Sequence, residues 1–200
     1  MLNTSQVESK IGVLILAGGK SERMVFPKAY LIWQGKTFLK RIVDAYEEAG
    51  IGNTILVLNK HFNTSEWAAY IDPVRNEVTL IENPHPEKGR FYSLKRGIKN
   101  MRNLDFCFVQ NVDNPFVDPE LIWNLLDQRN PNGFTSPVYN GRRGHPVLIS
   151  KKIIQYIDQL EEDDVNLRDV LSCFPGQGFE AGNEKILMNI NTPADYEKCF

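Results

Sequence analysis

The chain has 200 residues, of which 42% are hydrophobic and 24% charged, and its formal net charge is -2 at pH 7. This length and composition suit one globular domain with its own core, and the small net charge argues against a protein that binds nucleic acid or a membrane surface. The three cysteines lie far apart without a CxxC pair, so we expect reduced thiols, no structural zinc and a cytoplasmic location.

Short apolar runs alternate with helical patterns along the chain. The runs that predict strands are Gly12–Ala17, Thr54–Leu58, Val78–Glu82, Phe106–Gln110, Gly133–Val138 and Lys185–Asn189. The segments that predict helices are Phe38–Ala49, Ser65–Tyr70, Phe91–Met101, Pro119–Gln128, Lys151–Leu160 and Pro193–Cys199. Gly50 has the residue type of a helix stop, and Asp118 and Thr192 each precede a proline as an N-cap does. The alternation predicts an α/β fold with a doubly wound, mostly parallel sheet and helices on both faces.

The segment Leu16–Met24, with the sequence LAGGKSERM, follows the first predicted strand. Gly18 and Gly19 allow a sharp turn and a close approach of the backbone to a ligand, and consecutive amides in such a turn can bind an anion. Three cations surround the glycines, namely Lys20, Arg23 and Lys28. The segment is neither a Walker loop nor a GxGxxG fingerprint. It is either a phosphate-binding loop or a strand-terminating turn with surface cations, and its place at the carboxyl end of a parallel strand favours the loop.

Asp113 follows the apolar run Phe106–Gln110, which places it at the ligand-binding end of the predicted sheet. Mg²⁺ is usually held by one or two carboxylates together with phosphate and water oxygens, so one aspartate is a sufficient protein anchor. We expect this carboxylate to be exposed in a crevice. The alternative is a turn over Asp113 and Asn114 in which the polar side chains bond their own backbone.

A third polar group lies at GRRGHPVL, residues 141–148. Arg142, Arg143 and His145 carry the hydrogen-bond donors that an anionic ligand requires, and His145 stands at the start of an apolar run. The alternative is a histidine that satisfies backbone groups where that strand begins.

Five segments, taken in order, resemble the MobA-like NTP transferase family, nearest its molybdenum cofactor cytidylyltransferase subgroup. They are LAGGKSERM followed by Pro27-Lys28, Asn83-Pro84 with Gly89 and Ser93, Val112-Asp113-Asn114-Pro115, GRRGHPVL, and Asn189-Ile190-Asn191-Thr192-Pro193. The resemblance runs from Leu14 to Tyr196 and implies a Rossmann-like nucleotide-diphospho-sugar transferase fold. Residues 1–200 would form a single domain, with a nucleotide-binding N-terminal half and an acceptor-binding C-terminal half.

The resemblance also implies residue roles. The nucleotide-binding residues would be Leu16, Ala17, Gly18, Gly19, Lys20, Arg23, Lys28, Asn83, Gly89 and Ser93. Arg23, Lys28 and Asp113 would be catalytic, Asp113 and Asn191 would hold Mg²⁺, and the acceptor would lie near Arg142, Arg143 and His145. Three positions depart from the family. Val112 replaces the glycine that precedes the metal-binding aspartate. Val25 replaces a glycine, so that part of the loop must bend differently, and Asn191 replaces an aspartate and lacks its charge.

The reaction implied is transfer of a nucleotidyl group from a nucleoside triphosphate, CTP or GTP being favoured, to a phosphorylated small molecule such as molybdopterin or the molybdenum cofactor. Pyrophosphate would be released, and Mg²⁺ would be the cofactor. A molybdoenzyme is a further expected partner, whereas nucleic acid and membrane are not. Two alternatives stay open: a sugar 1-phosphate or another small phosphate as acceptor, and a non-catalytic nucleotide-binding partner of a cofactor enzyme.

Overall fold

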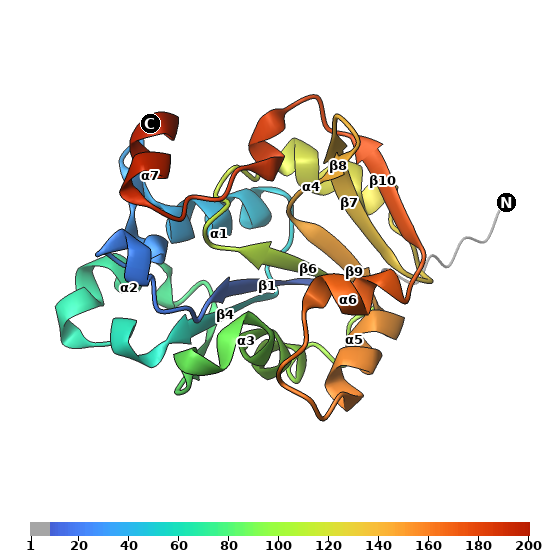
Figure 1. Cartoon of the computed structure of the whole chain (residues 1–200), viewed down its shortest axis with the longest axis horizontal. Coiled ribbons are helices and arrows are strands. Elements are labelled where there is room, and N and C mark those ends of the chain that lie inside the picture. Colours follow the sequence, from blue (N-terminus) through green and yellow to red (C-terminus); the bar gives the residue numbers. More distant parts are fainter. Residues whose placement is uncertain (1–8) are drawn as a thin grey trace, which may run out of the picture.

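The structure, a computed structural model, describes residues 9–200. An eight-stranded sheet forms its centre, with the strand order β10-β7-β9-β6-β1-β4-β5 and β8 paired to β7 (Figure 1). The strands are β1 (Ile11–Ala17), β4 (Thr54–Asn59), β5 (Thr79–Asn83), β6 (Phe106–Asn111), β7 (Phe134–Tyr139), β8 (Arg142–Arg143), β9 (Val147–Ser150) and β10 (Gly176–Glu180). A separate small pair joins β2 (Ile32–Trp33) to β3 (Lys36–Thr37).

The sheet is mixed, and mostly parallel. Strands β5, β4, β1 and β6 pair in parallel, and so do β7 and β10. Strand β9 lies antiparallel between β6 and β7 and so joins the two parallel groups. The predicted doubly wound, mostly parallel sheet is therefore confirmed, with β9 as an antiparallel insertion.

Helices cover both faces of this sheet, because successive strand residues point to opposite sides. The helices are α1 (Phe38–Glu48), α2 (Ala68–Arg75), α3 (Gly89–Ile98), α4 (Pro119–Asp127), α5 (Lys151–Gln159), α6 (Leu167–Ser172) and α7 (Pro193–Cys199). Val13 and Ile15 of β1 pack in one cluster with α1, α2 and α4. Leu14 and Leu16 pack in the other cluster with α3, α5 and α6. Of the residues described, none belongs to a helix long and apolar enough to cross a membrane.

The end signals seen in the sequence are confirmed at three helices. Gly50 follows α1 with φ +84°. The Asp118 carboxylate accepts a hydrogen bond from the Leu121 amide at 2.8 Å, and Thr192 forms a capping box with Asp195. The helix predicted at Ser65–Tyr70 begins with a 3₁₀ turn, and its α-helical part continues to Arg75.

The strand predicted at Lys185–Asn189 is wrong, because Glu184–Leu187 is a 3₁₀ helix. Its carbonyls find partners outside any sheet. The Asn114 side-chain amide donates to the Lys185 carbonyl at 3.1 Å and to the Met188 carbonyl at 2.5 Å, and the His145 amide donates to the Ile186 carbonyl at 2.9 Å. Side-chain and loop donors thus replace a neighbouring strand, while Ile186 is buried in the core.

Strand β10 was not predicted, since the sequence GQGFE lacks an apolar alternation. Its glycines explain the pairing with β7. A Cβ on Gly176 would lie 2.5 Å from the Phe134 ring, and one on Gly178 would lie 2.6 Å from Val138 Cγ2. Close packing against β7 therefore requires glycine at both positions.

Candidate functional site

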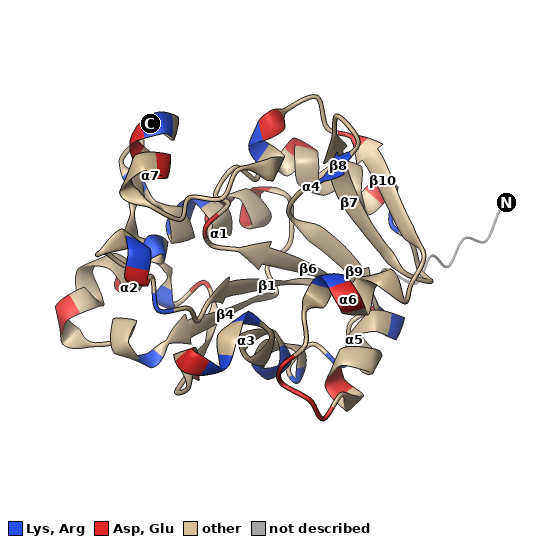
Figure 2. Cartoon of the chain, in the orientation of Figure 1, with Lys and Arg blue, Asp and Glu red and all other residues tan. Residues whose placement is uncertain are grey.

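The carboxyl ends of the parallel strands meet at one edge of the sheet, where residues from distant parts of the chain form a crevice. Gly18 follows β1, Asn83 ends β5, and Asp113 follows β6. The Asn191 segment, which leads into α7, returns to the same place. Lys and Arg are interspersed with Asp and Glu over the molecule, so the positive charge of the crevice is a local feature (Figure 2).

Asn83 and Ser93 hold the glycine loop from beneath. The Asn83 side-chain amide donates to the Gly18 carbonyl at 3.1 Å and to the Ser93 hydroxyl at 3.0 Å, and Asn83 is fully buried. The Asn59 side-chain amide donates to the Gly19 carbonyl at 3.1 Å. A Cβ on Gly18 would lie 2.4 Å from Ser93 Oγ, so only glycine fits there. Asn83, expected among the nucleotide-binding residues, thus bonds the backbone of the glycine loop and the side chain of Ser93.

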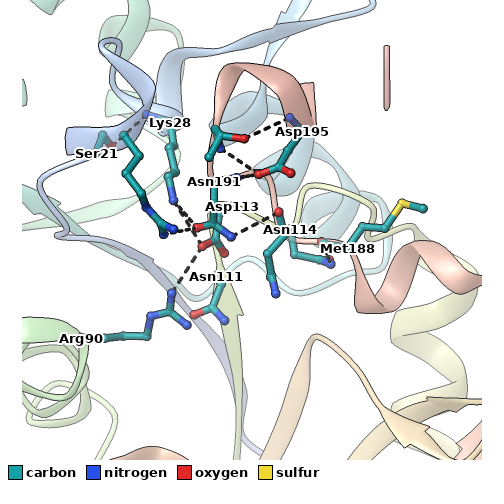
Figure 3. A network of polar contacts seen from close by, with 12 residues as sticks. Ser21, Lys28, Arg90, Asn111, Asp113, Asn114, Met188, Asn191 and Asp195 are labelled. Atoms are coloured by element: carbon teal, nitrogen blue, oxygen red, sulfur yellow. Dashed lines mark hydrogen bonds and ion pairs between the residues drawn. The ribbon is translucent and has the colours of Figure 1, made fainter. Parts of the chain in front are cut away.

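Three cationic side chains surround Asp113 and Asn191, and Figure 3 shows two of them, Lys28 and Arg90, pointing toward this pair. Lys28 Nζ donates to Asn191 Oδ1 at 2.7 Å and lies 3.6 Å from Asp113 Oδ2. Arg23 donates to Asn191 Oδ1 at 3.3 Å, and Arg90 donates to Asp113 Oδ2 at 3.3 Å. The proximity of Asp113 to Asn191, expected from the resemblance, is therefore present, and Arg90 is an additional member that the sequence did not indicate.

Backbone contacts fix the two central residues side by side. The Ile190 amide donates to the Asp113 carbonyl at 2.7 Å, and the Asn191 amide donates to the Asp195 carboxylate at 3.0 Å. The Lys28 amide donates to Ser21 Oγ at 3.2 Å, which anchors the base of the lysine side chain. The crevice is built on these bonds before any ligand binds.

Asp113 is only 5% exposed, so the expectation of an exposed carboxylate is wrong. Its Oδ2 atom faces the two cations, whereas its Oδ1 atom is buried without a hydrogen-bond partner among the described residues. A buried oxygen without a partner is unfavourable unless a ligand supplies one. Burial lowers the pKa of Lys28, and Arg23 and Arg90 lower it further against the opposing effect of Asp113.

Two cavities open at this edge. The smaller one, of about 240 Å³, is lined by the glycine loop, Ser21, Lys28, Ser93 and Asp113. The larger one, of about 1150 Å³, extends toward β7, β9 and α6. Four residues line both cavities: Leu16, Gly89, Arg90 and Asn111. The cavities are therefore neighbours that share a wall.

The predicted acceptor residues do not all face the larger cavity. His145 and Arg143 line it, whereas Arg142 is exposed and lines neither cavity. Arg143 also ties β10 to its neighbours, since it donates to Ser136 Oγ at 2.9 Å and to the Gln177 carbonyl at 2.7 Å. In the loop after β1, Lys20 lines neither cavity and pairs with Glu22 at 3.3 Å.

The His145 ring belongs to the cavity wall. Its backbone amide satisfies the Ile186 carbonyl, while its ring lies 3.4 Å from the Asn111 side-chain nitrogen. Burial lowers the pKa of His145, with a further lowering by Arg90 against the opposing charge of Asp113. The ring is therefore neutral near pH 7 and can donate or accept one hydrogen bond.

An acidic cluster elsewhere, formed by Asp44, Glu47 and Glu77, has carboxylates close enough to share an ion. Lys40 lies 2.7 Å from both Asp44 and Glu77, and Lys36 lies 2.6 Å from Asp44. Lysines thus already pair with two of its three carboxylates, and the cluster lines neither cavity. Asp113 is the better candidate for a metal ligand.

Comparison with known proteins identifies nucleotidyltransferases as relatives of this chain. The sequence model described as the MobA-like NTP transferase domain matches residues 13–180. The molybdenum cofactor cytidylyltransferase of Escherichia coli is 26% identical over 188 residues, which cover 94% of each chain. The probable molybdenum cofactor guanylyltransferase of Bacillus cereus is 30% identical over 205 aligned residues, again with 94% of each chain covered.

Solved structures share the fold at low sequence identity. A nucleotidyl transferase from Methanothermobacter thermautotrophicus superposes with a TM-score of 0.78 at 20% identity and covers 95% of each chain. The molybdopterin-guanine dinucleotide biosynthesis protein A of Archaeoglobus fulgidus has a TM-score of 0.64 at 17% identity, over 94% of this chain and 95% of that one. The family model covers most of the chain, including Gly18, Lys28 and Asp113, and the chain is therefore a nucleotidyltransferase that belongs to the MobA-like NTP transferase family.

Proposed function

We propose that this protein transfers the nucleotidyl group of CTP or GTP to the phosphate of a molybdopterin-type acceptor and releases pyrophosphate. The observation that carries the proposal is a pair of cavities that share a wall beside Asp113, with Lys28 and Arg90 against its carboxylate. The names of the relatives supply the acceptor class and the two candidate bases.

The smaller cavity suits the triphosphate. Gly18 and Gly19 line it with backbone, and Lys28 adds a positive charge. The larger cavity suits the acceptor because it combines the apolar side chains of Phe91, Phe134 and Val147 with the donors of Arg143 and His145. A planar, anionic heterocycle needs both kinds of surface.

Mg²⁺ fits the residues at the wall between the cavities. Asp113 Oδ1 is buried without a partner among the described residues, and Asn191 Oδ1 faces the same group of side chains. Carboxylate and amide oxygens are suitable ligands for this ion, so Asp113 and Asn191 would hold it together with phosphate oxygens. The ion would neutralise charge on the phosphates during the transfer.

The chemistry requires no general base from the protein. An acceptor phosphate oxygen attacks the α-phosphorus, a new P–O bond forms, and the bond from the α-phosphorus to the oxygen bridging it to the β-phosphorus breaks to release pyrophosphate. The attacking oxygen is already anionic, so this chain must align the two substrates and neutralise their charge. On the triphosphate side Lys28, which lines the smaller cavity, would do so, assisted by Arg23, which lines neither cavity but bonds Asn191 beside it. We further propose that the product passes to a molybdoenzyme in the cytoplasm.

The test is pyrophosphate release by the purified protein with CTP or GTP, with and without molybdopterin. Release that requires both substrates and Mg²⁺ supports the proposal. Lys28→Ala should abolish it, whereas Lys36→Ala, which removes an exposed lysine outside both cavities, should not. Triphosphate binding without any pyrophosphate release would instead favour a non-catalytic nucleotide-binding partner. Pyrophosphate release with a sugar 1-phosphate but not with molybdopterin would identify the sugar phosphate as the acceptor instead.

A further inference from the structure

Arg90 is the charged residue at the boundary between the two cavities. It is the second residue of α3, its side chain is 61% exposed, and its guanidinium lies 3.3 Å from Asp113 Oδ2. The other three residues that line both cavities are Leu16, Gly89 and Asn111, none of which carries a charge. Within residues 9–200, Arg90 alone brings a positive charge to both spaces.

The other cations near the cavities divide between them. Lys28 lines the smaller cavity only. Lys88, Arg143 and Arg168 line the larger one only. Arg143 is already committed to protein acceptors on Ser136, Gly176 and Gln177. Arg90, by contrast, makes one side-chain hydrogen bond, through one terminal nitrogen, to Asp113. A guanidinium offers five donors in a planar fork, so most of the Arg90 donors stay available to a ligand.

A transfer between two bound substrates takes place where their cavities meet. If the triphosphate occupies the smaller cavity and the acceptor the larger, the attacking phosphate must reach the shared wall. The planar fork of arginine matches two oxygens of a phosphate monoester. Asp113 draws the Arg90 guanidinium toward that wall and so orients it before the acceptor binds.

We propose that Arg90 binds the phosphate of the acceptor and positions it for attack, as a catalytic residue that contacts the second substrate rather than the triphosphate. This inference rests on the proposed function and adds to it the residue that recognises the phosphomonoester. It requires that loss of Arg90 weakens phosphate binding at the wall and leaves triphosphate binding nearly intact.

The experiment uses inorganic phosphate as the probe. The full chain is first saturated with a non-hydrolysable α,β-methylene analogue of CTP or GTP in the presence of Mg²⁺, and saturation is followed by calorimetry. Phosphate is then titrated and its binding is followed by the ³¹P line width. The variants are Arg90→Ala, Arg90→Lys and, as a matched control, Arg96→Ala. Arg96 lies on the same helix, bonds the Glu82 carbonyl and lines neither cavity.

We expect Arg90→Ala to weaken phosphate binding at least tenfold and analogue binding less than twofold. Arg90→Lys keeps the charge without the fork and should recover only part of the loss, whereas Arg96→Ala should match the wild type. In turnover, Arg90→Ala should raise KM for the acceptor but not for the triphosphate. Four outcomes would overturn the Arg90 assignment alone. Arg90→Ala could bind phosphate as the wild type does, or could lose as much affinity for the analogue as for phosphate. Arg90→Lys could recover phosphate binding fully, or the wild type loaded with analogue could bind no phosphate. Failure of the analogue to bind at all overturns the proposed function, and this assignment with it.

Discussion

Replacement of Val25 by glycine should stabilise the protein. Val25 has φ 61° and ψ -22°, a left-handed conformation that costs a residue with a Cβ about 1–2 kcal/mol. Glycine removes this strain but loses about 0.4–1 kcal/mol through the greater entropy of its unfolded chain. Val25 is 97% exposed, so no buried contact is lost. The two central values differ by a gain of about 0.8 kcal/mol, within a span of about 0–1.6 kcal/mol, and 1 kcal/mol corresponds to a rise in Tm of about 2–4 °C for a chain of this size.

The gain can be measured by urea unfolding and by differential scanning calorimetry of the ligand-free protein. Val25→Ala is the matched control, because alanine keeps the Cβ and therefore most of the strain. A Tm that falls in Val25→Gly, or one that rises equally in Val25→Ala, would refute the argument from backbone strain.

Other expectations concern the crevice. Gly18→Ala should destabilise the fold by about 1–3 kcal/mol, because the added carbon would lie 2.4 Å from Ser93 Oγ. In urea unfolding, the double variant with Ser93→Ala should recover part of the lost stability. Strict additivity of the two changes would contradict the clash. Asn191→Asp should tighten Mn²⁺ binding to the empty protein, measured by electron paramagnetic resonance, because a second carboxylate is added; an unchanged Kd would count against Asn191 as a ligand. Lys28→Ala should weaken triphosphate binding by about 1.5–3 kcal/mol in calorimetry, and unchanged affinity would remove Lys28 from the site. The pKa of His145 is lowered in the fold, so the unfolded chain takes up the proton first as pH falls through about 6.5, and the free energy of unfolding then falls by at most about 1.4 kcal/mol per pH unit. His145→Gln should flatten this pH dependence. An unaltered curve of unfolding free energy against pH would exclude His145 as its source.

The sequence predicted well those parts of the fold that rest on local chemistry. Strands β1, β4 and β6 are continuous apolar runs, and such runs are typical of parallel strands buried on both faces. Helix α4 begins after Asp118 because this N-cap side chain accepts a hydrogen bond from the Leu121 amide, only three residues further along the chain. The positions of Gly18 and Asp113 at the crevice followed from the rule that parallel strands end together.

The parts that sequence could not supply depend on contacts between distant residues. Lys185–Asn189 has the composition of a strand, and only the Asn114 side chain, more than seventy positions away, shows why its carbonyls need no sheet partner. Arg90 carries no local signal either, since its place beside Asp113 depends on how α3 packs against β1. Burial of Asp113 likewise results from the return of the chain at Ile190.

The lowered pKa of Lys28 has a consequence for chemical labelling. Burial and the neighbouring arginines leave more of its amine unprotonated at neutral pH than in a surface lysine, and the neutral amine is the nucleophilic form. A bound triphosphate would both shield this amine and favour its protonated form. The rate at which a small acylating reagent modifies Lys28, followed by mass spectrometry against the exposed Lys60, would therefore report how much of the crevice is occupied without any turnover.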